Sequence, residues 1–356
     1  MKRIAGILRV KNDGMFIEPC IESCIDALDE LIVVYNDCTD NSESEIKRMK
    51  DKYPSKIRYF EYPHKILGFS LNKKDYDIAI NLPENSPNLL CGYCNFALAK
   101  VTCEYALKID ADQIYFTEEL KKWCDFIRNC EPQKMGLKTL LGKCFSNYIT
   151  LYRFLSIKSG HRLPIMPSWL VKSLYPAYIS FAKYSFSNGK SCLSLSGVNV
   201  LEKKKTLISM GHKLNDFMSG YPFNGVGDTV IFKVSKDTYF EKFVMTDYNT
   251  SNAKSFSVIE QFRHPYKLMY VGYFWKHIRA MRPGVFEKSV RQLEIDDRAY
   301  LSIDKFEKLS YKQIEREAPE DIFQLFHRIL FAFIYKANKK QMLRSLRNTN
   351  IFHYGK

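Results

Sequence analysis

Two aspartates, Asp110 and Asp112, end an apolar run in the segment YALKIDADQIYF, residues Tyr105–Phe116. Along an extended strand, residues i and i+2 point to the same side, so the spacing predicts two carboxylates aimed at one point. Neighbouring carboxylates repel each other, and a shared cation relieves that repulsion. Oxygen ligands favour Mg²⁺ or Mn²⁺, which proteins commonly hold with one or two carboxylates plus substrate phosphates. A strand-end turn, in which aspartate is common, is the alternative interpretation.

The elements that position these aspartates alternate between strands and helices. The spacing of apolar residues predicts strands over Arg3–Val10, Glu30–Tyr35, Lys56–Pro63 and Tyr105–Asp110, and helices over Met15–Leu28, Ser42–Tyr53 and Gly92–Cys103. Ser42 and Glu45 have the spacing of a capping box at the start of the second helix. This alternation predicts a mostly parallel sheet with helices on its faces, in which ligands bind beyond the carboxyl ends of the strands.

Three of the predicted strands end in polar residues. The first strand ends with Arg9 and Lys11, the second with Asp37 and Asp40, and the fourth with the aspartate pair. We expect these ends to meet in one crevice, because the carboxyl ends of parallel strands lie at one edge of a sheet. Solvated strand-end charge is an equal alternative for Arg9 and Lys11. Capping of a turn and helix is the favoured role for Asp40.

Composition limits the class of protein. The chain has 356 residues, is 46% hydrophobic and carries a formal net charge of +15, which predicts a sizeable core and an anionic partner. Cys91 and Cys94 form a C-x-x-C motif without the second pair that a zinc site needs, so reduced thiols in a cytoplasmic protein are expected. The N-terminal segment lacks the pattern of a signal peptide, and no run reaches the roughly 18 apolar residues of a spanning helix.

Three segments resemble a known family. They are ILRVKND (Ile7–Asp13), VVYNDCTDNSESEI (Val33–Ile46) and YCNFALAKVTCEYALKIDADQIY (Tyr93–Tyr115). They are similar to segments of GT-A glycosyltransferases, and more narrowly of the bacterial β-1,4-N-acetylgalactosaminyltransferases that build lipooligosaccharide outer cores. The resemblance covers about residues 3–125 and is weaker near residues 193–201 and 227–232.

The resemblance implies a GT-A fold, an α/β architecture with a mostly parallel central sheet, a helical insertion and a helical C-terminal region. Residues 1–130 are then the nucleotide-sugar-binding half and residues 131–260 the acceptor-side half, with the insertion at about 143–190. Residues 261–356 form a C-terminal region.

The same resemblance implies roles for individual residues. Asp110 and Asp112 are the metal and diphosphate site, Asp37 contacts the uridine, and Arg9 and Lys11 line the nucleotide pocket. A histidine late in the chain is a third metal ligand, for which His277 and His264 are candidates. A lone histidine that satisfies local hydrogen bonds is the alternative for either.

The family makes β-linkages from α-linked donors, so the resemblance implies an inverting reaction with a carboxylate base. Asp228, which we expect in a glycine-containing loop within NGVGDTVIF, is the first candidate for that base, and Asp216 in KLNDFMSGYPF is the second. An aspartate that closes a β-turn is the alternative for both. GalNAc from UDP-GalNAc is the expected donor sugar, with UDP-Glc, UDP-Gal and UDP-GlcNAc as alternatives. A basic nucleic-acid-binding protein is the rival from another class, but no RRM, KH or helix-turn-helix signature supports it.

The C-terminal tail combines apolar residues with cations. Residues 322–356 contain seven Lys or Arg and no acidic residue. Together with the aromatic insertion, this predicts a helix that lies on an anionic membrane and a peripheral location on the cytoplasmic face of the bacterial inner membrane, where the acceptor would be a lipid-linked oligosaccharide or glycan. A C-terminal helix packed on the domain is the alternative.

Overall fold

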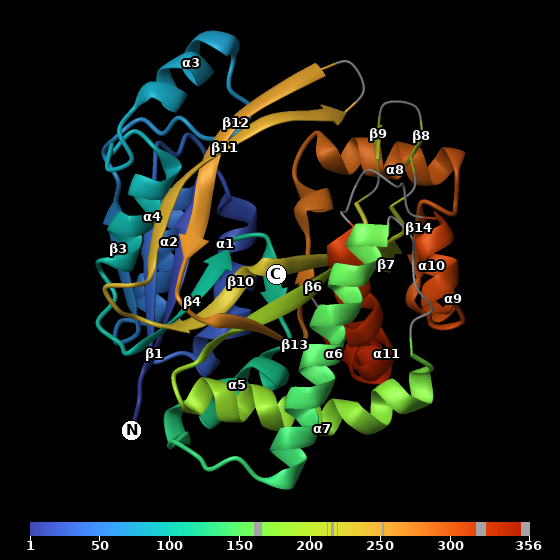
Figure 1. Cartoon of the computed structure of the whole chain (residues 1–356). Helices are drawn as coiled ribbons and strands as arrows, with labels where there is room; N and C mark the ends of the chain where they lie inside the picture. The colour runs from blue at the N-terminus through green and yellow to red at the C-terminus, as the bar shows by residue number, and fades with distance from the viewer. Residues whose placement is uncertain are drawn as a thin grey trace. The chain divides into compact units, whose positions relative to one another are not determined.

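The computed structural model describes residues 1–159, 166–211, 213–214, 217–218, 220–250, 253–317 and 325–349. The chain divides into two compact units (Figure 1), each discontinuous in sequence. The first unit comprises Met1–Ala111 with Ile231–Tyr266, and the second comprises Asp112–Val230 with Lys267–Lys356. This division differs from the three consecutive segments expected from the sequence, because residues 231–266 return to the first unit.

The first unit contains a parallel sheet with the order β3-β2-β1-β4. Its strands are β1 (Ile4–Val10), β2 (Glu30–Tyr35), β3 (Ile57–Glu61) and β4 (Tyr105–Asp110). The last residues of β10 (Phe223–Lys233) pair antiparallel with β4, with Ile231 opposite Leu107. All six residues of β2 are buried, as expected for a strand covered on both faces. The predicted α/β class with a mostly parallel sheet is therefore confirmed.

Four helices and one hairpin complete the first unit. They are α1 (Gly14–Cys24) with the 3₁₀ turn η1 (Ile25–Ala27), α2 (Ser42–Lys52), α3 (Lys73–Asn81), α4 (Leu90–Leu98), and the antiparallel strands β11 (Tyr239–Thr250) and β12 (Ala253–Arg263). The helix at Ser42 begins where the sequence predicts, but the capping box is wrong. The Ser42 hydroxyl accepts a hydrogen bond from the Asp13 backbone N–H, and Glu45 pairs with Arg48.

The second unit is built around a mixed sheet. Strand β13 (Lys267–His277) pairs in parallel with β6 (Ser191–Lys203) and antiparallel with β5 (Gln113–Tyr115). The antiparallel strands β7 (Lys205–Ser209) and β14 (Tyr300–Ser302) continue from β6, and β8 (Lys213–Leu214) pairs with β9 (Phe217–Met218).

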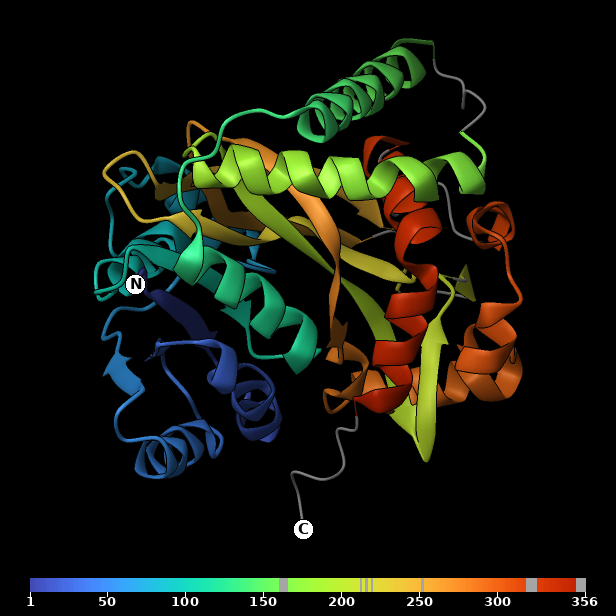
Figure 2. The ribbon, with the colours of Figure 1, turned by 90° about the horizontal axis from the view of Figure 1, so that it is seen from below.

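The helices of the second unit include the predicted helical insertion. They are α5 (Thr117–Asn129), α6 (Leu137–Ser159), α7 (Ser168–Ser187), η2 (Arg279–Met281), α8 (Val285–Ile295), α9 (Ile303–Glu307), α10 (Tyr311–Glu317) and α11 (Leu325–Asn348). Figure 2 shows α7 between the outer helix α6 and strands β6 and β13. The insertion thus forms a helix pair that begins before the expected residue 143.

The tail helix α11 corrects the prediction of a membrane-lying tail. Residues Ile329–Tyr335 are all buried, and farther along so are Leu343 and Leu346. Phe333 packs edge-on against Phe145 of α6. The apolar side chains that were expected to face lipid therefore belong to the core of the second unit. None of the helices in the described part of the chain is both long and apolar enough to cross a membrane.

Candidate active site

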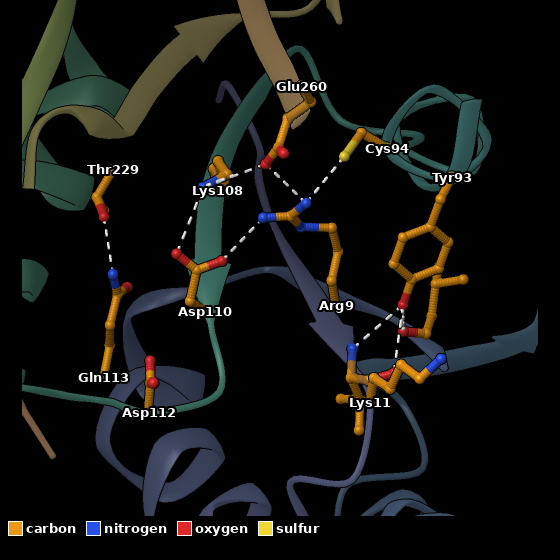
Figure 3. A network of polar contacts seen from close by, with 12 residues as sticks. Arg9, Lys11, Tyr93, Cys94, Lys108, Asp110, Asp112, Gln113, Thr229 and Glu260 are labelled. Carbon is orange, nitrogen blue, oxygen red and sulfur yellow. Dashed lines mark hydrogen bonds and ion pairs between the residues drawn. The ribbon is translucent and has the colours of Figure 1, made fainter. Parts of the chain in front are cut away.

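Asp110, at the end of β4, lies beside two cations (Figure 3). It is opposite Arg9 in the strand register, and Arg9 Nη2 lies 3.0 Å from Asp110 Oδ1. Lys108 Nζ lies 3.4 Å from Asp110 Oδ2. Burial alone would raise the pKa of Asp110, but Lys108 and Arg9 lower it below its usual value. The carboxylate is thus ionised and held at the carboxyl end of the sheet, beside the end of β1 as predicted.

A second carboxylate balances this pair of cations. Glu260 of β12 lies 2.7 Å from Arg9 Nη1 and 4.0 Å from Lys108 Nζ (Figure 3). Arg9 Nη1 also donates to Cys94 Sγ at 2.9 Å, and burial raises the pKa of that thiol to about 12. Two cations and two carboxylates therefore form a charged network in the first unit. Arg9 is held by this network, while its predicted role in lining a nucleotide pocket stays a prediction.

Lys11 and Asp37 lie together at the ends of β1 and β2. Lys11 Nζ is 3.3 Å from Asp37 Oδ2, and both side chains are exposed. Asp37 and Asn12 adopt left-handed backbone angles, with φ of 46° and 56°. Such conformations cost energy in residues other than glycine and are concentrated at functional sites. The predicted uridine contact and pocket cation thus lie side by side and accessible.

Asp40 has the structural role that the sequence favours. Its Oδ2 accepts from Gly14 N–H and its Oδ1 from Ser42 N–H, both at 2.9 Å. These two amides begin α1 and α2, so Asp40 caps both helices. The hydrogen bonds to Ser42 and Gly14 lower the pKa of Asp40 although burial would raise it.

The charged network around Asp110 predicts an acid-sensitive part of the stability. A carboxyl whose pKa is lowered by folding contributes stability above its unfolded pKa of about 4, and loses it as the pH falls through the folded value. We expect Asp110→Asn to lower the free energy of unfolding by about 1.5–3 kcal/mol at neutral pH and to flatten its decline below pH about 4. Urea unfolding measured from about pH 7 to about pH 3 gives the free energy of unfolding at neutral pH and its decline as carboxyl groups titrate.

Asp37→Asn is the control for this experiment. Its carboxylate side chain is 68% exposed and solvent screens its pair with Lys11, so its free energy of unfolding should change little. An Asp110→Asn protein with the wild-type pH profile would contradict the network.

Asp112 lies in the second unit with a histidine and an arginine. Its Oδ1 is 3.4 Å from His277 Nε2, and its Oδ2 is 3.3 Å from Arg282 Nη2. The Ile278 N–H donates to the main-chain oxygen of Asp112 at 2.9 Å, so the end of β13 is tied to the residue that precedes β5. Two of the predicted metal ligands, Asp112 and His277, are therefore brought together.

The orientation of His277 is set by an asparagine of β6. Asn199 Nδ2 donates to the Tyr221 carbonyl, so its Oδ1 faces His277 Nδ1, at 2.5 Å. Nδ1 donates to Asn199 Oδ1 in this contact, and Nε2 is the ring nitrogen that faces Asp112. Asn224 Nδ2 also lies near Nδ1, at the longer distance of 3.0 Å. Histidine ligands of metals are commonly oriented in this way through their second nitrogen.

These residues fit a hard divalent cation that completes its shell elsewhere. One carboxylate and one imidazole nitrogen are suitable first ligands for Mn²⁺, and substrate phosphates and water supply the others. No group of three or more His, Cys, Asp or Glu side chains suited to a metal occurs among the residues that the structure describes. His264 instead accepts a hydrogen bond from Tyr266 N–H and stacks on Phe262.

The orientation of His277 gives a testable role to Asn199. Asn199→Ala removes the acceptor for Nδ1–H, and the affinity for Mn²⁺ is expected to fall about 10–100-fold. The fold should persist, because the β6–β13 pairing is made by the backbone. A Mn²⁺ titration followed by electron paramagnetic resonance measures the affinity. Asn224→Ala, which removes the longer contact, is the matched control. Equal affinities of Asn199→Ala and the wild type would contradict this orientation.

The segment around Asp228 belongs to β10. The structure corrects the expected loop, because residues 223–233 form a strand in which Gly225 and Gly227 have φ of 91° and 80°. The neighbouring Thr229 accepts a hydrogen bond from Gln113 Nε2 at 2.9 Å (Figure 3). The backbone at Asp228 is thereby tied to the residue after Asp112. The Asp228 side chain and all of Asp216 lie outside the described residues.

Sequence reasoning missed Glu260, Arg282 and Asn199. Asn199 is a single polar residue within the run GVNVL, and that interruption is a signal that could have marked it, whereas Glu260 is one of several polar residues in β12 and carries no such signal. Arg282 follows the end of β13 and carries no comparable local signal. Its partner Asp112 lies 170 residues earlier in the chain.

The α/β sheet with charged side chains at its strand ends is an architecture suited to binding nucleotides. Residues 3–131 match the family model described as beta-1,4-N-acetylgalactosaminyltransferase (CgtA). The predicted resemblance to N-acetylgalactosaminyltransferases is confirmed over this part of the chain.

Solved structures give shorter matches. Glucosyl-3-phosphoglycerate synthase from Mycobacterium tuberculosis with Mg²⁺ and UDP is 20% identical, with 32% of this chain and 34% of that chain covered and a TM-score of 0.20. The same synthase with Mn²⁺, UDP-glucose and phosphoglyceric acid is 18% identical, with the same coverage and TM-score. The chain thus spans about a third of the length of these proteins. No curated protein matches the chain.

Proposed function

We propose that the protein is an inverting, metal-dependent glycosyltransferase that transfers GalNAc from UDP-GalNAc to a bacterial surface glycan or lipooligosaccharide. The observation that carries the proposal is the family match over residues 3–131, which includes all four parallel strands and Asp110. The Asp112–His277 pair supports the metal requirement, since it adds an oxygen and a nitrogen ligand of the kinds that Mn²⁺ accepts.

The donor is bound at the ends of the parallel strands. Asp37 accepts hydrogen bonds from the uridine and Lys11 lies beside the nucleotide. Asp110 and Asp112, with His277 as the histidine ligand, would hold Mn²⁺ or Mg²⁺, and the bound metal would neutralise charge on the departing diphosphate. Arg282 supplies a further cation next to Asp112. Asp110 also pairs with Arg9 and Lys108 at the strand ends.

The acceptor hydroxyl is activated by a carboxylate. Asp228 takes its proton as the oxygen attacks the anomeric carbon from the face opposite the diphosphate, which inverts the configuration at that carbon. Asp216 is the second candidate for this base. A positioned base contributes about 10²–10⁴ to the rate of such a reaction. The residues that bind the nucleotide do not contact the sugar and therefore do not select the hexose. UDP-Glc, UDP-Gal and UDP-GlcNAc are the alternative donors.

Donor screening by released UDP tests the proposal. The protein is incubated with Mn²⁺, a lipooligosaccharide acceptor preparation and each of the four UDP-sugars in turn. UDP-GalNAc should release the most UDP, and a chelator should abolish the release. Release from another UDP-sugar alone would keep the transferase and change the donor. A protein that releases UDP from none of them but binds nucleic acid would overturn the proposal in favour of the rival class.

A further inference from the structure

Helix α6 has two apolar faces, and one of them is exposed. The inner face packs on α7, where Gly142 allows a close approach because an added Cβ would lie 1.9 Å from the Ala177 carbonyl oxygen. Phe145 and Ile149 on this face are buried. The outer face carries seven apolar side chains that are 44–87% exposed, which we call the α6 stripe. They are Leu137, Leu140, Leu141, Leu151, Phe154, Leu155 and Ile157.

The stripe recurs at helical spacing near the two ends of α6, over residues 137–141 and 151–157. The rotation of the helix is fixed by the packing of its inner face, so the stripe cannot turn inward. Trp169, 68% exposed at the start of α7, adds an aromatic ring beyond the end of α6. Exposed apolar patches of this extent mark binding surfaces in proteins, and tryptophan is enriched where proteins meet the headgroup region of a bilayer.

The sequence segment that contains the stripe carries charge of one sign. Residues 132–201 contain nine Lys or Arg and no acidic residue, although the whole chain has 39 acids. Lys138, Lys143 and Lys158 of α6 are exposed. Apolar residues beside lysines, without acids, are the pattern of a helix that lies in the plane of an anionic membrane surface.

We propose that the α6 stripe, with Trp169, docks the protein onto an anionic lipid bilayer, with α6 lying in the interface. The lysines beside the stripe are complementary in charge to an anionic bilayer, which favours this partner. A second copy of the chain would place two cationic surfaces against each other, and nucleic acid would leave the apolar side chains exposed to water. None of the described helices meets the requirement for crossing a bilayer, which agrees with a surface-lying element. This surface replaces the tail helix, whose apolar side chains are in the core.

The inference deepens the proposed function, because it names the surface that would bring the enzyme to a lipid-linked acceptor. It can be tested without any transfer reaction. The full chain is sedimented with vesicles of phosphatidylcholine alone and with vesicles that contain phosphatidylglycerol. Binding is expected only to the anionic vesicles and should be lost at high salt, because the shorter Debye length screens the lysines.

Substitutions separate the two parts of the surface. The variant Leu151→Ser, Phe154→Ser, Leu155→Ser should lose most of the vesicle-bound fraction. Its matched control is Phe69→Ser, Ile78→Ser, Phe243→Ser, which removes three exposed apolar side chains elsewhere and should bind like the wild type. The charge variant Lys138→Glu, Lys143→Glu, Lys158→Glu should also lose binding. Its control is Lys65→Glu, Lys74→Glu, Lys236→Glu, all at exposed lysines.

The outcomes are distinct. UDP release with a soluble acceptor sugar should be unchanged in the stripe variants, so a failure of membrane binding is not confused with a failure of the proposed activity. No binding of the wild type to anionic vesicles at low salt would overturn the inference. So would equal binding by the stripe variant, or a dimer in solution that dissociates when the stripe is substituted.

Discussion

Asp112→Asn is expected to lower turnover by about 10³-fold, because the carboxylate is proposed to hold the metal that stabilises the leaving diphosphate. Such stabilisation is worth several kcal/mol, and each 1.4 kcal/mol is about a factor of ten. Asparagine has the same shape, and the main-chain bond from Ile278 to residue 112 is unaffected. We therefore expect a folded protein with a melting temperature close to that of the wild type. Turnover by UDP release and thermal unfolding measure the two effects.

Asp297→Asn is the matched control, since that carboxylate is 77% exposed and pairs only weakly with Lys305 at 3.4 Å. It should retain wild-type turnover. The metal-site interpretation would be wrong if Asp112→Asn kept near-normal turnover both with and without a chelator.

Asp228→Asn is expected to lower turnover by about 10²–10⁴ with little change in the affinity for UDP, as the loss of a general base does. The backbone beside Asp228 is tied to Gln113 through Thr229, at the start of the strand that follows Asp112. Asp228 is therefore adjacent in sequence to Thr229, and the hydrogen-bond partner of Thr229 directly follows the proposed metal ligand Asp112. The measurement is single-turnover transfer, combined with UDP binding by calorimetry.

Asp216→Asn is the comparison for that variant. The proposed assignment requires the larger loss at Asp228. A wild-type rate for Asp228→Asn with a large loss for Asp216→Asn would move the base to Asp216, and normal rates for both would place the base on another residue.

The local pattern of apolar residues was sufficient to predict the parallel strands of the first unit. The β-branched run in β2 and the apolar strands β1 and β4 gave nearly the observed boundaries, because strands buried on both faces are continuous apolar segments. The capping box failed because it competes with a contact distant in sequence. Ser42 is used by Asp13, 29 residues earlier, which a local motif does not show.

The site was predicted in part. The i, i+2 spacing of Asp110 and Asp112 predicts two carboxylates aimed at one point, and this stays a prediction. Asp110 pairs with residues of the first unit, and Asp112 with residues more than 160 positions away along the chain. Such partners depend on the topology of β12 and β13, which no pattern near the aspartates specifies.

The prediction that the C-terminal tail lies on a membrane rested on apolar residues followed by cations, and this pattern also fits a helix in the core. The segment ILFAFIY, residues Ile329–Tyr335, is apolar at every position and is buried throughout. A helix that is apolar all round is typical of a core, whereas a membrane-surface helix keeps a polar face along the same turns. The cations that follow it lie in the second half of α11, where Lys339 donates to the Leu309 carbonyl and Arg347 pairs with Asp304 and Glu307.

The measurement that tests the central claim most directly is thermal unfolding of the full chain with UDP, with Mn²⁺ and with both. A ligand set that binds only the folded state raises the melting temperature in proportion to its affinity. We expect a clear rise only when UDP and Mn²⁺ are present together, and no such rise for Asp112→Asn or His277→Ala. A rise of the same size with UDP and a chelator, or no rise with UDP and Mn²⁺ together, would contradict a metal-dependent UDP-sugar transferase.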